Sequence, residues 1–113
     1  MANVTLTPQQ ISRTGVDLTD TGSLSTSNNY FFRNTGREFL HFKKTGAGAC
    51  VVTIVTPKTV AGLAVADPTV SVPATTGDLM VGPFPPDTFN NPSGDVEFTL
   101  SEITGLTGAC AAL

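Results

Sequence analysis

The residues able to do chemistry are few and widely spaced. The single histidine, His41, stands between Leu40 and Phe42 in the segment FLHFKK. A general base needs a nucleophile and an orienting acid beside it, and no serine of this chain lies in a GxSxG motif. The carboxylates are scattered, so no pair is marked out for glycoside hydrolysis. We expect no catalytic residue and interpret His41 as a strand histidine. A small hydrolase, the weakest alternative, would need a cleft around it.

The two cysteines, Cys50 and Cys110, lie far apart in the chain. In a protein that is made and kept in the cytoplasm, such cysteines are typically reduced, buried thiols that behave as small apolar side chains. We favour that interpretation. A disulfide between Cys50 and Cys110 is the less favoured alternative and would require the two to meet in space.

No pattern for a metal or a cofactor is found. One histidine and two cysteines without CxxC spacing do not form a zinc ligand set, and DLTD at residues 17–20 is too sparse for a calcium loop. The glycines of TGAGAC, residues 45–50, precede a strand, whereas a dinucleotide loop follows one and opens a helix. We expect no metal or cofactor, and predict a hairpin turn at TGAGAC.

Composition sets the class of protein. A chain of 113 residues is the size of one domain, and only 13% of its residues are charged, about half the usual share. Its 18 threonines and 7 serines fill the surface with neutral groups and favour strands. A net charge of −3 disfavours nucleic acid as a partner. No apolar run approaches the roughly 20 residues that span a bilayer, and MANVTLTPQQ lacks the features of a secretory signal.

Thr-Gly pairs divide the chain into short segments with strand character. NYFFRN and REFLHFKK flank Thr35-Gly36 and predict a β-hairpin. The run ACVVTIVTP predicts a central strand buried on both faces, whereas DVEFTLS alternates and predicts Val96, Phe98 and Leu100 facing inward. Helical character is confined to residues 59–67, where Gly62 weakens it.

These segments predict an all-β fold: a single-domain antiparallel β-sandwich or small barrel of about seven strands, with Thr-Gly turns and little or no helix. Residues 1–28 would form an N-terminal strand or arm and a Ser/Thr-rich loop. Residues 29–113 would form the core, with a proline-rich loop, VGPFPPDTFNNPSG, at residues 81–94.

Two segments have the residue types of a partner-binding surface. Arg33 and Arg37 flank one predicted turn, where they are either two solvated arginines or paired interface anchors. The proline-rich loop is pre-ordered by its prolines and loses little entropy on binding. Its phenylalanines are either core plugs or partner anchors. The residues concerned are Pro83, Phe84, Pro85, Pro86 and Phe89.

The N-terminal segment ANVTLT offers a second mode of contact. Val4 and Leu6 alternate with polar residues, so this strand could add to the sheet edge of a neighbouring protein. The apolar segment GACAAL, residues 108–113, is expected to pack against something.

Four segments resemble a family of small structural proteins encoded by tailed bacteriophages: RNTGREFLHFKKTGAGACVVTIVTP, GLAVADPTVSVPA, VGPFPPDTFNN and DVEFTLSEITGL. The resemblance covers about residues 30–106 and includes no catalytic motif. It implies a virion component made in the host cytoplasm, and we favour a head decoration (capsid cement) protein on the capsid surface. Its partners would be the major capsid protein and neighbouring copies of itself, with a dimer or trimer as options, and with no membrane and no nucleic acid.

In that role, residues 81–92 with Arg33 and Arg37 would face the capsid. A head–tail connector or tail-tube component is the runner-up. A β-sandwich adhesion or carbohydrate-binding module is more distant, since the chain has no tryptophan for sugar stacking.

Overall fold

The computed structural model describes residues 3–17 and 24–113, and in these it has eleven strands and one short helix. The elements are β1 (Asn3–Leu6), β2 (Gln9–Gln10), β3 (Asn29–Arg33), β4 (Glu38–Lys44), β5 (Cys50–Ile54), β6 (Thr59–Val60), β7 (Leu63–Ala64), β8 (Thr69–Val72), β9 (Gly77–Val81), α1 (Pro86–Phe89), β10 (Asp95–Leu100) and β11 (Leu106–Ala112). The fold is mostly β, as predicted. Part of the Ser/Thr-rich loop expected before residue 29 falls on residues 18–23, outside the described residues.

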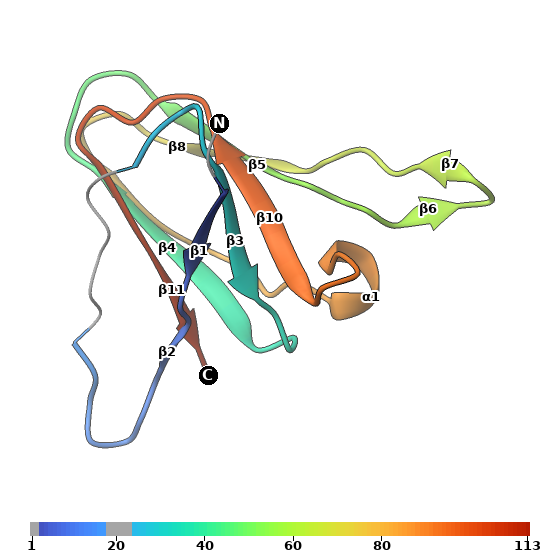
Figure 1. Cartoon of the computed structure of the whole chain (residues 1–113). Helices are drawn as coiled ribbons and strands as arrows, with labels where there is room; N and C mark the ends of the chain where they lie inside the picture. The colour runs from blue at the N-terminus through green and yellow to red at the C-terminus, as the bar shows by residue number, and fades with distance from the viewer. Residues whose placement is uncertain (1–2, 18–23) are drawn as a thin grey trace.

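Two mixed sheets pack together and enclose the core (Figure 1). The five-stranded sheet has the order β1-β3-β10-β5-β8, and the four-stranded sheet has the order β2-β11-β4-β9. In β10 the alternation of the sequence places Val96, Phe98 and Leu100 in the core, as predicted. Phe98 stacks on Tyr30 at a centroid distance of 5.4 Å and meets Phe42 edge-on at 5.8 Å, which joins the two sheets through aromatic contacts.

The sheets are mixed because the N-terminal segment runs parallel to its neighbours. β1 pairs in parallel with β3, and β2 pairs in parallel with β11. The prediction of a purely antiparallel fold of about seven strands was therefore wrong. No hairpin turn connects β1 to β3 or β2 to β11, so no turn geometry imposes the antiparallel direction. The additional strands are β2, β6 and β7, of two residues each, and β11, which contains most of the apolar C-terminal segment.

Two predicted hairpins are instead crossings between the sheets. β3 belongs to the five-stranded sheet and β4 to the four-stranded sheet, and the segment TGAGA then returns the chain to β5 in the first sheet. At the first crossing, the buried Glu38 carboxylate accepts hydrogen bonds from the backbone N–H groups of Thr35 (2.7 Å) and Arg37 (3.2 Å). A carboxylate that binds its own turn in this way stabilises a local bend in place of a two-residue hairpin.

β5 lies inside its sheet, as predicted, but only one of its faces is buried. Val52 and Ile54 point into the core, whereas Val51 is exposed. Prediction of burial on both faces was wrong because nothing among the described strands covers the outer face of this sheet at Val51.

Residues 59–64 form an antiparallel ribbon rather than the helical turn that the sequence suggested. Ala61 and Gly62 occupy the turn with φ of 53° and 78°. A tight turn with two positive φ values matches the twist of a β-hairpin. This ribbon, β6–β7, extends away from both sheets as an arm (Figure 1). Along the described chain there is no helix long and apolar enough to cross a membrane.

Candidate functional site

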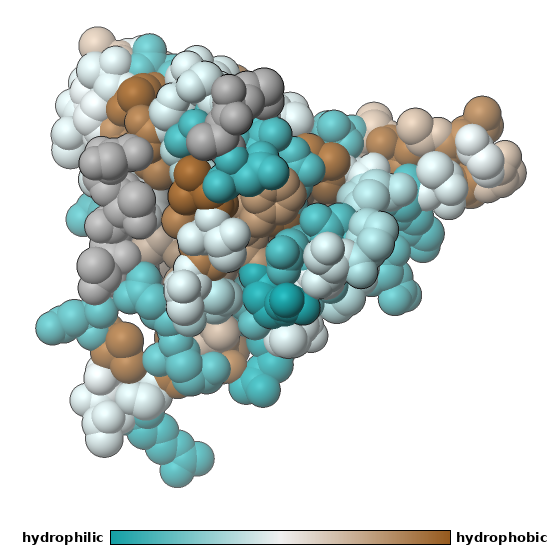
Figure 2. Space-filling view, viewed as in Figure 1, coloured by the Kyte–Doolittle hydropathy of each residue, from teal (hydrophilic) through white to brown (hydrophobic). Residues whose placement is uncertain are grey.

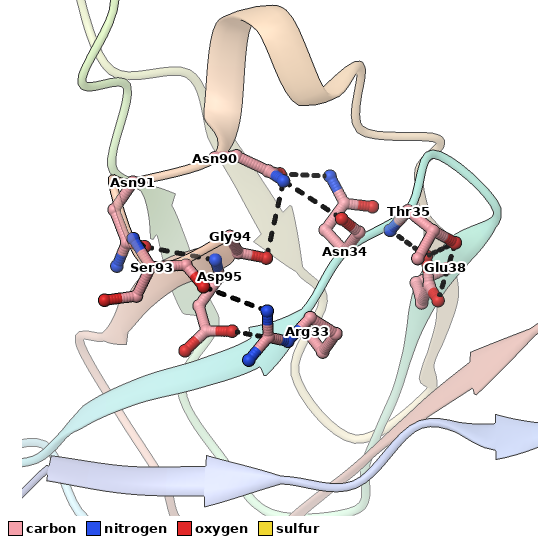
Figure 3. A network of polar contacts seen from close by, with 9 residues as sticks. All are labelled: Arg33, Asn34, Thr35, Glu38, Asn90, Asn91, Ser93, Gly94 and Asp95. Carbon is pink, nitrogen blue, oxygen red and sulfur yellow. Dashed lines mark hydrogen bonds and ion pairs between the residues drawn. The ribbon is translucent and has the colours of Figure 1, made fainter.

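The turn at residues 33–38 and the loop at residues 83–95 lie together and form one surface, which we call the proline-loop end (Figure 3). Asn34 and Asn90 join the two segments. The Asn34 side-chain amide donates to the main-chain oxygen of Phe84 and to Oδ1 of Asn90, both at 2.7 Å. The Asn90 amide donates to the main-chain oxygens of Asn34 (2.9 Å) and Gly94 (3.3 Å). Segments that are remote in sequence are thereby held in one arrangement.

The loop is ordered further by hydrogen bonds between its own backbone and the side chain of Asn91. Asn91 Oδ1 accepts hydrogen bonds from the N–H groups of Ser93 (2.9 Å) and Asp95 (3.1 Å). The single helical turn α1 begins with Pro86. A backbone N–H at this first position would have no hydrogen-bond partner within the helix, so proline costs nothing there. The sequence predicted an extended loop ordered by its prolines, whereas the loop contains a helical turn and its hydrogen bonds come largely from asparagines. Sequence reasoning missed Asn34 and Asn90. The only signal was that asparagine is common in turns.

The two phenylalanines of the loop serve the core. Phe84 is 3% exposed and lies 5.5 Å from Phe32 between ring centroids, while Phe89 is partly buried and meets Phe84 edge-on at 5.6 Å. Of the two alternatives, core plug or partner anchor, the structure supports the core plug for Phe84. The exposed residues of the loop are Pro83, Pro85, Pro86, Asp87, Pro92 and Ser93.

Arg33 and Arg37 are both exposed at this end. Arg33 is held in place: its guanidinium donates from Nη1 to the main-chain oxygen of Ser93 (3.0 Å), and Nε lies 3.4 Å from Asp95 Oδ1. Arg37 belongs to the turn next to Pro86, since a Cβ added to Gly36 would lie 3.4 Å from that ring. The two arginines therefore differ, because the Arg33 guanidinium already has partners in its own chain.

Beside the proline-loop end lies a shallow apolar pocket of about 340 Å³ at the β4–β9 side of the four-stranded sheet. Its lining includes Arg37, Phe39, Met80, Val81, Pro83 and Leu113. No local sequence pattern indicates this pocket, because its walls come from three separate segments: residues 36–39, residues 80–83 and Leu113.

The N-terminal strand is already used within the molecule. Val4 and Leu6 of β1 are partly buried against the core, and β1 pairs with β3 through four register positions from Asn3 to Leu6. Addition of this strand to a neighbour's sheet, as the sequence suggested, would require β1 to leave its own sheet.

In the described residues His41 has an acid beside it, but its neighbours across the sheet include no nucleophile. His41 Nε2 lies 2.6 Å from Asp78 Oδ1, and His41 Nδ1 is buried without a hydrogen-bond partner. Its neighbours across the sheet are Met80 and Ala109, neither of which is a nucleophile. In residues 3–17 and 24–113 no three side chains of His, Cys, Asp or Glu gather closely enough to hold a metal ion.

Cys50 and Cys110 are both buried and both free, so the alternative of a disulfide is not realised. Burial raises the pKa of the Cys110 thiol to about 12, and the charge of Glu38 adds to the rise. Such a thiol is protonated and unreactive at neutral pH.

No protein-family model, no curated protein and no solved structure matches this chain.

Proposed function

We propose that this protein is a non-enzymatic virion component, a decoration or cement protein that binds the outside of a phage capsid through its proline-loop end and stabilises the expanded head. The convergence of Arg33, Arg37 and the exposed prolines on one pre-ordered surface carries the proposal. These residues come from two segments joined by Asn34 and Asn90. A rigid surface loses little conformational entropy on binding.

The charge pattern of this end supports a protein partner. Arg37 is exposed, and its guanidinium can form a bidentate pair with a carboxylate of a partner. The prolines beside it present apolar surface and have no backbone N–H groups, which would need hydrogen-bond partners when buried in an interface. Asp87 is also exposed on this loop, so the surface fits a partly apolar face of a capsid subunit that offers a carboxylate to Arg37 and a hydrogen-bond donor or cation to Asp87.

The remaining surface suits a protein that coats a shell in many copies. Low charge and abundant threonine and serine leave few groups for non-specific ionic contacts. A modest interface acts strongly when one protein bridges several subunits of a symmetric lattice, because each further contact is then intramolecular.

The deciding measurement is the copy number of the protein in purified virus particles, by quantitative mass spectrometry against the major capsid protein. Hundreds of copies, in a simple ratio to the capsid subunit, are expected. A ring of about six or twelve copies, as closed cyclic symmetry gives, would replace the decoration role with that of a connector or tail-tube component. Absence from particles would overturn both.

A further inference from the structure

The most exposed apolar side chains gather in two separate places. Among the large hydrophobic residues of the described chain, four have more than half of their surface exposed: Val60 (59%), Leu63 (72%), Met80 (71%) and Leu113 (62%). Val60 and Leu63 form the tip of the β6–β7 arm. Met80 and Leu113 line the apolar pocket. One site is convex and the other concave.

The arm has no support from its own sandwich. Figure 1 shows it extending away from both sheets, and Figure 2 shows hydrophobic side chains at its outer end. A Cβ added at Gly62 would meet nothing within 4 Å. An isolated two-stranded ribbon is marginally stable in water at best, so a contact at its tip would supply the stabilisation that its own chain does not.

The pocket suits such a tip in chemistry and in size. Its apolar walls are formed by Phe39, Met80, Val81 and Leu113, and its volume of about 340 Å³ is in the range of sites that enclose small apolar groups. The turn residues are Ala61, with only a methyl side chain, and Gly62, with none, so they would not obstruct the entry of Val60 and Leu63.

We infer that the β6–β7 tip of one copy docks into the pocket of a second copy. The β6–β7 tip and the pocket lie on different parts of the same molecule, so each copy can donate its tip to one copy and accept the tip of a copy in its pocket. Where the arm and the pocket of one copy engage two different neighbours, the contact joins copies head to tail and builds either a closed ring or an open chain. Where they engage the same neighbour, two such contacts form a reciprocal twofold dimer. Neither assembly brings two tips together.

The contact is small and is expected to be weak between free molecules. One hairpin tip buries well below the roughly 1,200 Å² of a stable protein–protein interface, so association in solution should depend steeply on concentration. Copies held side by side would associate far more strongly. The inference does not rest on capsid binding, although Arg37 and Pro83 border both the pocket and the proline-loop end.

The test uses two single-cysteine additions to the full chain, Leu63→Cys and Met80→Cys, mixed in equal amounts with a short bismaleimide crosslinker. The natural cysteines are buried, and the unaltered protein reports any background from them. The matched control replaces Met80→Cys with Val51→Cys, which adds a thiol at another exposed apolar position on the other sheet.

Mixed dimers of Leu63→Cys with Met80→Cys should form at least about fivefold faster than dimers with the Val51→Cys control. A chain carrying both Leu63→Cys and Met80→Cys should give a ladder of higher oligomers if the copies join head to tail, and a dimer alone if two copies dock reciprocally. Equal rates for the two mixtures would overturn the inference. Rapid crosslinking of Leu63→Cys with itself would also overturn it, because that result indicates a twofold contact between tips. The experiment needs no capsid, so it can fail while the copy number in particles still supports the proposed function, and the reverse also holds.

Discussion

Asn34 and Asn90, 56 positions apart, exchange hydrogen bonds: the amide of Asn34 donates to the side-chain oxygen of Asn90, and the amide of Asn90 donates to the main-chain oxygen of Asn34. This reciprocal pair fixes the proline-loop end to the sandwich, with both residues largely removed from water. The proposed capsid contact therefore depends on a polar pair that makes no contact with the partner.

Asn34→Ala removes the two hydrogen bonds that the Asn34 amide donates, to the Phe84 carbonyl and to Oδ1 of Asn90, and keeps the main-chain oxygen that the Asn90 amide binds. An unsatisfied buried polar group costs about 1–3 kcal/mol, so we expect the free energy of unfolding to fall by that amount in urea denaturation. Asn3→Ala, on the exposed face of an edge strand, is the matched control and should change stability by no more than about 0.5 kcal/mol. Equal stability of the two variants would show that the pair contributes nothing.

Phe84→Ala should destabilise the protein by about 3–5 kcal/mol, the usual cost of removing a buried aromatic ring. The ring contacts Phe32 and Phe89 and is almost fully buried. Met80→Ala removes a side chain of similar size from the surface and should be close to neutral. A stable Phe84→Ala protein that no longer binds capsids would return Phe84 to the role of partner anchor.

The positions and inward faces of the strands were largely predictable from the sequence, but their partners were not. The alternation in β10 determines that Val96, Phe98 and Leu100 share a face, and the structure confirms it. Alternation carries no information on which strand lies alongside. The segments around Thr35-Gly36 satisfied every local criterion for a hairpin, yet they enter different sheets because Glu38 binds the turn from within.

The proline-loop end could be predicted only in its parts. Proline content indicated a rigid loop, and two nearby arginines indicated an exposed turn. That the two segments meet depends on contacts between residues 50 and 56 positions apart, those of Asn34 with Phe84 and with Asn90. Whether Phe84 anchors a partner or fills the core depends likewise on Phe32, which no local pattern places beside it.

The burial of Cys110 can be tested by measuring how the stability of the protein changes with pH. Its thiol has a pKa of about 12 in the folded protein, against 9.0 for an unperturbed thiol. Above pH 9 the unfolded chain loses a proton that the folded protein keeps, so stability falls as pH rises from 9 toward 12, by about 1.4 kcal/mol per pH unit from this group. Below pH 9 its contribution is constant. Urea denaturation from pH 8 to 11 should show a steeper decline for the unaltered protein than for Cys110→Ala. Parallel curves would place the thiol in contact with water.

Glu102 should contribute to the pH dependence of stability in the acid range. Hydrogen bonds from the side chain and backbone of Thr104 lower the pKa of its carboxyl below 4.5, and the charge of the buried Lys44 lowers it further. Stability from this group is present above pH 4.5 and is lost as pH falls through the lowered pKa. Glu102→Gln should therefore lose less stability than the unaltered protein between pH 5 and pH 3. Coincident curves for the two proteins would contradict this.

Arg37→Glu tests the proposed capsid contact without disturbing the fold. The side chain is exposed, whereas Arg33 already binds Asp95 and Ser93 within the chain, so reversing the charge at Arg37 should leave the fold intact. Arg37 also lines the apolar pocket, so binding is measured at protein concentrations where the free protein is monomeric. Replacing an interface cation by an anion leaves the partner's carboxylate facing a like charge, and we expect affinity for particles stripped of the protein to fall at least tenfold, about 1.4 kcal/mol. Arg13→Glu makes the same change of charge at an exposed position outside the proline-loop end and should bind like the unaltered protein. Equal loss in both variants would indicate a general effect of net charge, and no loss in either would place the capsid contact elsewhere on the molecule.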